Sequence, residues 1–176
     1  YTESGEIKLY YVEAAGRDVS ADITPVIFVH EFAGDHRSWE PQMRFFARRY
    51  RVVTMSYRGY PPSDIPTDPA AYSQDILIDD ILGLCDALNI DKAHFCGLSI
   101  GGNSVVFLGL KHPDRCLSLV AAAAGPERTR PVAASASFTS TRSIVRNSRK
   151  APKTIKIRMV ETTVAMGRPK TPSKEY

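Results

Sequence analysis

Residues 93–102 read AHFCGLSIGG, an apolar run that leads into a serine flanked by glycines. A mostly apolar helical pattern follows and stops at Pro113, because a proline cannot continue a helix. The order of strand, sharp turn and helix predicts that Ser99 lies at the apex of a strained turn, with its hydroxyl lifted clear of a sheet. Gly97 and Gly101 fit this prediction, because side chains there would collide where the strand end presses on the helix start.

Ser99 is therefore a candidate nucleophile. The amide of the next residue, Ile100, is expected at a helix N-terminus, where unpaired N–H groups and the helix dipole favour a developing negative charge. A Gly-x-Ser-x-Gly pattern also occurs in ordinary turns, but the strand pattern before it and the helix pattern after it favour the catalytic interpretation. Adjacent residues are thus predicted to supply a nucleophile and one oxyanion donor.

Apolar runs alternate with helical patterns along the first part of the chain. Buried strands are predicted near residues 25–29, 51–55, 93–96 and 116–122, and helices at 39–50, 72–88 and 101–111. Ahead of them, residues 6–13 alternate as a half-buried antiparallel strand, and residues 19–23 give a weaker strand signal. This alternation predicts an α/β fold, with a doubly wound, mostly parallel sheet and helices on both of its faces.

The loop after residues 25–29 is expected near Ser99, because open α/β sheets bind ligands at the carboxyl ends of their central strands. We assign a second oxyanion donor to the amide of Phe32 in this loop. His30, at the end of the strand, is better explained as a hydrogen-bonding partner that fixes the loop than as a proton shuttle.

Two charge patterns receive structural interpretations. Arg58 and Asp64 lie in a turn-rich loop and are predicted, from the sign of their charges alone, to clamp it by an ion pair. The acidic residues of the 72–88 helix mostly alternate with apolar positions, which predicts a solvated helix face and not a metal site. These residues are Asp75, Asp79, Asp80 and Asp86.

The composition suits a single domain: 176 residues with 43% hydrophobic content can bury a sizeable core. No apolar run approaches the ~20 residues that a bilayer crossing needs, so no membrane span is expected. Cys85, Cys96 and Cys116 lie within apolar patterns and lack metal-ligand spacing, which favours buried free thiols in a reducing, cytoplasmic compartment. No metal or organic cofactor is predicted.

The charge is divided unevenly along the chain. Residues 1–126 carry a formal charge of −5 and residues 127–176 carry +9, which gives the total of +4. The second segment contains no leucine, so we expect a basic, poorly ordered tail after a core at 1–126. If later strands are missing, the apolar strand at 117–122 becomes an exposed sheet edge. One weak strand is predicted in the tail. Its apolar residues are Ile155, Ile157, Met159 and Val164.

Three stretches resemble, in their order and spacing, the α/β-hydrolase fold and its group of serine-nucleophile esterases, enol-lactonases and C–C bond hydrolases. They read VIFVHEFAGDHRSW, MSYRGYPPSD and FCGLSIGG, and the resemblance covers roughly residues 5–125. It implies that Ser99 is the nucleophile and that the amides of Phe32 and Ile100 form the oxyanion hole. Glu31 departs from the pattern, because the family usually has a glycine after the histidine of this loop.

In this family an acid and then a histidine follow the nucleophile and complete a triad with it. Only one of the four histidines, His112, follows Ser99, and it stands at the end of the predicted helix. Glu127 is a weak candidate for the acid. A serine hydroxyl without a base is a poor nucleophile, so the chain as given is expected to be nearly inert. Residues 127–176 stand where the family's lid and later strands belong. Truncation, a frame-shifted reading or a replaced terminus would each explain this.

The resemblance implies a hydrolase that acts on a carboxylic ester, thioester or lactone of a small molecule. The alternative is a non-catalytic remnant whose basic tail binds an acidic partner, such as a nucleic acid or an anionic membrane surface. A nucleic acid is disfavoured, because the tail offers only Phe138 and Tyr176 for base stacking.

Overall fold

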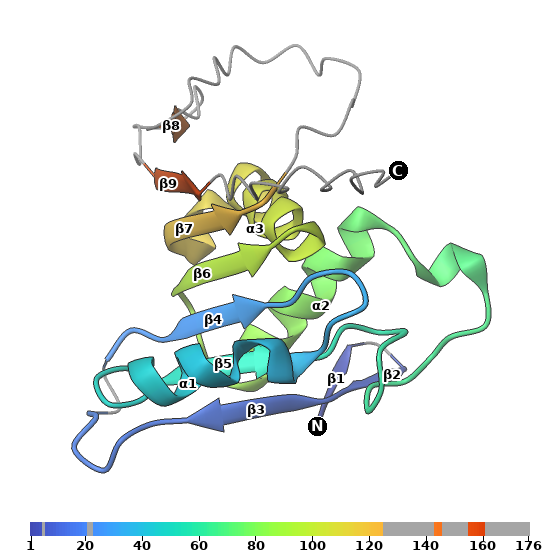
Figure 1. The fold of residues 1–176 in the computed structure, drawn as a ribbon. Coiled ribbons are helices and arrows are strands. Elements are labelled where there is room, and N and C mark those ends of the chain that lie inside the picture. The colour runs from blue at the N-terminus through green and yellow to red at the C-terminus, as the bar shows by residue number, and fades with distance from the viewer. Residues whose placement is uncertain (5, 21–22, 125–142, 146–154, 161–176) are drawn as a thin grey trace, which may run out of the picture.

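The computed structural model describes residues 1–4, 6–20, 23–124, 143–145 and 155–160. These residues form a mostly parallel sheet with helices on both faces (Figure 1), which confirms the predicted fold class. In spatial order the strands of this sheet are β3 (Tyr11–Ala14), β5 (Val52–Met55), β4 (Val26–Val29), β6 (Ala93–Leu98), β7 (Cys116–Ala122), β9 (Ile155–Val160) and β8 (Ser143–Val145). The five strands from β5 to β9 run parallel to one another, whereas β3 and β8 pair antiparallel at the two ends.

Helices follow β4, β5 and β6, and each returns the chain to the start of the next parallel strand. One face of the sheet carries α1 (Glu40–Phe46), which follows the short 3-10 helix η1 (His36–Trp39). The other face carries α2 (Gln74–Ala87) and α3 (Ile100–Lys111) (Figure 1). Two further 3-10 helices flank them, η2 (Pro69–Ala71) before α2 and η3 (Pro113–Arg115) after α3. The hydroxyl of Ser73 starts α2 by accepting a hydrogen bond from the Ile76 amide at 3.2 Å.

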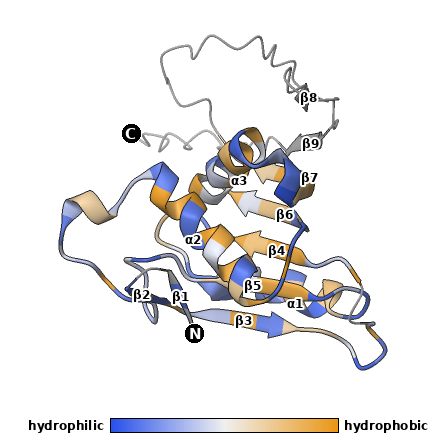
Figure 2. Ribbon diagram, turned by 180° about the vertical axis from the view of Figure 1, so that it is seen from behind, coloured by the Kyte–Doolittle hydropathy of each residue, from blue (hydrophilic) through white to orange (hydrophobic). Residues whose placement is uncertain are grey.

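The central strands are apolar because helices cover them. Figure 2 shows hydrophobic residues along β4 and β5, and Ile27, Phe28 and Val29 of β4 are buried. In β6 buried and half-buried residues alternate, and Phe95 is buried in the same cluster as residues of α2 and α3, among them Leu108. Two hydrophobic cores therefore sandwich the sheet and fix the positions of the loops at its carboxyl edge.

The predicted strand at residues 6–13 is divided in two. β1 (Thr2–Ser4) pairs with β2 (Ile7–Leu9) in a small separate hairpin, and β3 continues into the main sheet beside β5. The weaker prediction at residues 19–23 is wrong for the described residues of that stretch, which form no strand.

Strand pairing continues beyond residue 126. β9 runs parallel to β7, and β8 pairs antiparallel with β9. The condition for an exposed edge at 117–122, the absence of later strands, is therefore not met, because β9 takes up the outer hydrogen-bonding groups of β7. The division into a core and a tail stays a prediction, and most of the tail lies outside the described residues. Of the apolar residues chosen for the weak strand, Ile155, Ile157 and Met159 lie in β9, and Val164 lies outside the described residues.

The predicted ion pair between Arg58 and Asp64 is not formed. Arg58 instead makes a bidentate pair with Asp80 of α2, with its Nε 2.7 Å from Oδ2 and its Nη2 2.6 Å from Oδ1. Asp80 is fully buried, so the prediction of a solvated acidic face is wrong at this position, whereas Asp75, Asp79 and Asp86 are exposed. The pair ties the loop after β5 to α2.

Candidate active site

Ser99 occupies the turn between β6 and α3. Its backbone has φ 53° and ψ −115°, a positive φ that side chains disfavour. The turn is tight because two glycines bring backbones into contact. A Cβ on Gly97 would lie 2.1 Å from the Gly101 carbonyl oxygen, and a Cβ on Gly101 would lie 2.4 Å from the Val29 carbonyl oxygen. The strained strand-turn-helix predicted around Ser99 is therefore present.

The backbone of Ser99 is fixed, whereas its hydroxyl is not engaged. Its N–H donates to the Ala122 carbonyl at 2.8 Å, and its carbonyl accepts from the Asn103 N–H at 2.9 Å. Within the part of the chain that the structure describes, the half-buried side chain makes no hydrogen bond. This hydroxyl contributes no hydrogen bond to the described fold, so it is available for chemistry.

The first predicted oxyanion donor, the amide of Ile100, comes directly after Ser99 in the chain. α3 begins at Ile100, and the amides of a first helical turn have no carbonyl four residues back within the helix. The Ile100 N–H therefore lies at the positive end of a 12-residue helix, beside the serine.

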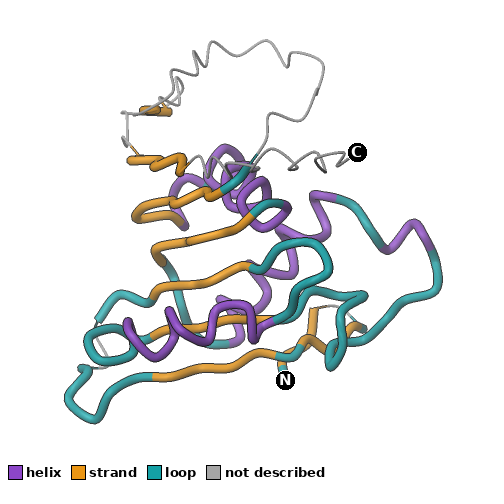
Figure 3. Tube along the Cα trace, viewed as in Figure 1, coloured by secondary structure: helices purple, strands orange, loops and turns teal. Residues whose placement is uncertain are grey.

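The second predicted donor, the amide of Phe32, lies in the loop between β4 and η1. Figure 3 shows this loop at the same edge of the sheet as the turn between β6 and α3. The two segments touch, because a Cβ on Gly101 would lie 2.6 Å from the carbonyl oxygen of His30. The Phe32 N–H donates no hydrogen bond among the described residues. Phe32 is 73% exposed, and its ring forms an edge-to-face pair with Tyr60 at a centroid distance of 6.5 Å. The structure thus brings the loop of Phe32 against the start of α3.

His30 anchors this loop, as the sequence interpretation favoured. Its imidazole is fully buried, and Nε2 accepts a hydrogen bond from the Tyr57 N–H at 3.1 Å. The proton therefore resides on Nδ1, which donates to the Glu31 carbonyl at 2.7 Å. Burial is the main cause that lowers the pKa of His30, so the neutral ring is favoured.

The other three histidines are engaged elsewhere. His36 and His94 hydrogen-bond through Nδ1 to the hydroxyls of Ser56 and Ser118, at 3.0 and 2.7 Å. His94 is the second residue of β6, roughly 16 Å of extended chain before Ser99. His112 caps the opposite end of α3. Among the described residues no histidine forms a hydrogen bond with Ser99, and Glu127, the weak acid candidate, lies outside them.

Two carboxylates flank the loop of Phe32. Asp35 is paired with Arg37, whose guanidinium lowers the pKa of Asp35 to about 2. Glu31 Oε1 accepts a hydrogen bond from the Ser38 hydroxyl at 2.9 Å, and Glu31 Oε2 is buried without a partner among the described residues. Ser38 was not singled out from the sequence. The signal for it is the three-residue spacing from Asp35 to Ser38, which is typical of a capping box and is formed here.

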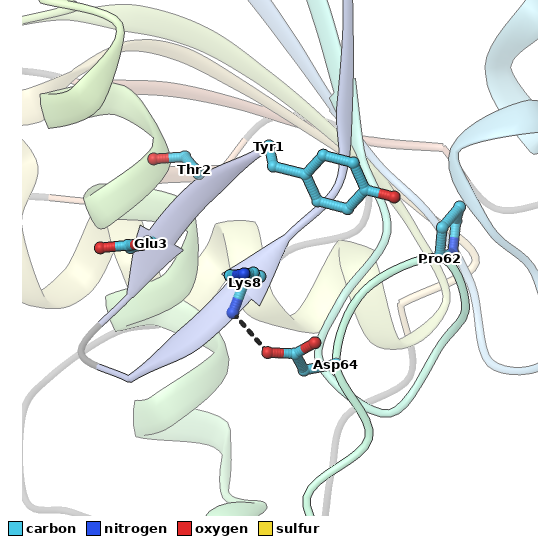
Figure 4. Close-up of a pocket in the computed structure, with 6 residues that line it drawn as sticks. All are labelled: Tyr1, Thr2, Glu3, Lys8, Pro62 and Asp64. Atoms are coloured by element: carbon cyan, nitrogen blue, oxygen red, sulfur yellow. Dashed lines mark hydrogen bonds between the residues drawn. The ribbon is translucent and has the colours of Figure 1, made fainter.

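Other features of the described residues lie away from these atoms. An open surface hollow is lined by Tyr1, Thr2, Glu3, Lys8, Pro62 and Asp64 (Figure 4). The described residues include no cluster of three or more metal-ligating side chains. None of the described helices has both the length and the apolar character to cross a bilayer.

The sequence matches known hydrolases over the region that builds this site. Residues 24–157 match the alpha/beta hydrolase fold family. The chain is 38% identical over 97 residues to 3-oxoadipate enol-lactonase 1 of Acinetobacter baylyi, which covers 55% of this chain and 35% of that protein. It is 38% identical over 106 residues to a putative carbamate hydrolase, RutD, of Caulobacter segnis, which covers 60% of this chain and 38% of that protein.

A solved structure is similar to this chain as well. The enol-lactonase from Burkholderia xenovorans LB400 superimposes with a TM-score of 0.61 at 31% identity, over 66% of this chain and 43% of that one. The chain thus spans between 35% and 43% of the length of these relatives. The family match covers well over half of the 176 residues, with the turn at Ser99 inside it. The chain belongs to the α/β-hydrolase fold family.

Proposed function

We propose that this chain carries the nucleophile and the oxyanion hole of a hydrolase that cleaves a carboxylic ester, thioester or lactone of a small molecule. The observation that carries the proposal is the backbone of Ser99, held at φ 53° with its hydroxyl unengaged by the described residues. Strain of this kind persists where the surrounding structure enforces it, and it marks functional sites. The enol-lactonase names of two relatives support a lactone as one member of the substrate class.

The geometry supports an acyl-transfer mechanism. Ser99 Oγ bonds to the carbonyl carbon, its proton passes to a base, and the carbonyl electron pair moves onto oxygen. The amides of Phe32 and Ile100 stabilise that oxyanion. Collapse of the tetrahedral intermediate breaks the bond to the leaving group, which takes up a proton, and water then releases the acid from the acyl-serine. No described residue is placed to take the serine proton, so we expect the chain by itself to react slowly.

A fluorophosphonate probe tests the assignment, because it phosphonylates an activated serine and releases fluoride. We expect slow modification of purified 1–176 that maps to Ser99 by peptide mass spectrometry and is absent in Ser99→Ala. The chain offers Ser104→Ala as a matched control, since Ser104 is a buried serine of α3. Modification spread over several serines, or none in a folded sample, would reject the proposal.

The uneven charge carries a second candidate function, the binding of an acidic partner by residues 127–176. Their formal charge of +9 would give an affinity that salt weakens. Retention of 1–176 on a heparin column below about 0.2 M salt, lost when these residues' lysines and arginines are changed to glutamine, supports this candidate. Passage without retention at low salt rejects it. The three cysteines lie in apolar sequence patterns without metal-ligand spacing, so we propose a reducing, cytoplasmic location for either function.

A further inference from the structure

The loop that carries Phe32 is closed on itself by a chain of hydrogen bonds. The Asp35 N–H donates to the Ser38 hydroxyl oxygen at 3.4 Å, and that hydroxyl donates to Glu31 Oε1 at 2.9 Å. The Gly34 N–H also donates to the Glu31 carbonyl at 3.2 Å. Phe32 lies inside the closed segment, so these contacts fix both sides of its amide.

The closure is tight and strained. A Cβ on Gly34 would lie 2.5 Å from Glu31 Oε1 and 2.7 Å from the Ser38 hydroxyl oxygen, so the glycine makes room for the contact. Ala33, next to Phe32, has a positive φ of 60°. An alanine in this region relaxes unless its surroundings hold it there, and the contact between Glu31 and Ser38 is the side-chain restraint that spans the loop.

The carboxylate of Glu31 is otherwise unfavourable at this position. One of its oxygens is buried without a partner among the described residues. A negative charge one residue from an oxyanion donor also opposes the charge that develops on a bound substrate. The hydrogen bond from the Ser38 hydroxyl thus explains a glutamate at this position.

We propose that Glu31 and Ser38 are positioning residues that aim the Phe32 amide into the oxyanion hole. This inference rests on the proposed function, because it concerns the same hole. The role requires a hydrogen-bond acceptor at residue 31 and a hydroxyl at residue 38, and it does not require the negative charge. Two substitutions of Glu31 therefore test whether the acceptor or the charge matters. Glu31→Gln keeps the acceptor, whereas Glu31→Met has a similar size and loses it.

The experiment measures phosphonylation of Ser99 by a fluorophosphonate in purified 1–176, as a maximal rate and a half-saturating probe concentration. We expect Glu31→Met and Ser38→Ala to lower the maximal rate about 10- to 100-fold, the range for a misplaced catalytic group, with little change in the half-saturating concentration. Glu31→Gln and Ser38→Thr should stay within about threefold of the unaltered chain. Glu40→Met, on the exposed surface of α1, controls for the change of residue type.

The outcomes separate the two proposals. Equal maximal rates in all variants, with Ser99 still modified, would overturn the positioning role and leave the nucleophile assignment standing. Equal losses in Glu31→Gln and Glu31→Met would also overturn it, because the charge and not the acceptor would then be responsible. Absence of Ser99 modification in the unaltered chain would reject the proposed function itself. Circular dichroism melts check folding, and if Glu31→Met fails to fold, Ser38→Ala against Ser38→Thr decides.

Discussion

The buried imidazole of His30 accepts a hydrogen bond from the backbone amide of Tyr57 at 3.1 Å. This contact joins the loop after β4, which carries Phe32, to the loop after β5. Since Nδ1 of the same ring donates to the Glu31 carbonyl at 2.7 Å, one neutral side chain holds two loops at the carboxyl edge of the sheet.

Stability should therefore fall as the pH is lowered through the ordinary histidine range. Burial lowers the pKa of His30, so below about 6.5 the unfolded chain binds more protons than the folded one. The contribution is complete above that pH and is lost as the pH falls toward the lowered pKa. We expect urea unfolding at pH 5.5 to give a smaller free energy than at pH 7.5. His30→Asn should reduce this difference. An unchanged difference in His30→Asn would contradict the assignment.

Breaking the buried ion pair should destabilise the fold. Asp80→Ala leaves the buried Arg58 guanidinium without its carboxylate, and we expect a loss of about 3–5 kcal/mol in the free energy of unfolding. The neighbouring Asp79 is exposed, so Asp79→Ala should change it by less than about 0.5 kcal/mol. Urea titration of both variants tests this, and similar midpoints would show that the pair is not a structural tie.

The turn at Ser99 should not tolerate a side chain at Gly97. A Cβ there would lie 2.1 Å from the Gly101 carbonyl oxygen, a backbone atom that cannot move away cheaply. We expect Gly97→Ala to cost about 2–4 kcal/mol of stability and to abolish Ser99 labelling. Gly83→Ala, in the middle of α2, should be neutral or stabilising by up to about 1 kcal/mol, because alanine favours helices. A normally labelled Gly97→Ala variant would mean that the turn is looser than described.

The cysteines should react slowly in the folded chain. Burial raises the pKa of Cys85 and Cys116 to about 12 and that of Cys96 to about 11. Only about one thiol in a thousand or fewer is then a thiolate at pH 8, so iodoacetamide should modify all three much faster in 8 M urea. Cys96, which is half-buried, should lead in the folded state. Rapid native labelling of Cys85 would show that its core opens.

Much of the fold could be predicted because its strands are covered on both faces. Continuous apolar runs gave β4, β5, β6 and β7, and the glycines around Ser99 gave the turn that follows β6. Strand pairings that depend on the assembled sheet could not be predicted from the sequence. β8 is only three residues long, and nothing in the local sequence indicates that β9 pairs with β7. The predicted partner of Arg58 was wrong for a similar reason. The sign of a charge does not distinguish Asp64, which is near in sequence, from Asp80, which lies on a helix tied to the loop.

The site divides in the same way. Ser99 and Ile100 depend on a local strand-turn-helix pattern, which the sequence displays. Glu31 was noticed only as a departure from the family pattern, and Ser38 was not noticed, because their contact depends on how the loop folds back on itself. The role of His30 as a loop anchor could be argued from its place at a strand end, but its partner Tyr57 depends on the parallel pairing of β4 and β5.

The most direct measurement of the central claim is the fate of Ser99 in the presence of p-nitrophenyl acetate. If Ser99 is the proposed nucleophile and no residue of the chain serves as its base, it should be acetylated slowly and should keep its acetyl group, because water is not activated for the second step. We predict one acetyl per chain on Ser99 by mass spectrometry, no acetylation in Ser99→Ala, and no sustained release of nitrophenol. Rapid turnover that Ser99→Ala abolishes would show that a base is present, and a folded chain without acetyl-Ser99 would show that Ser99 is not the nucleophile.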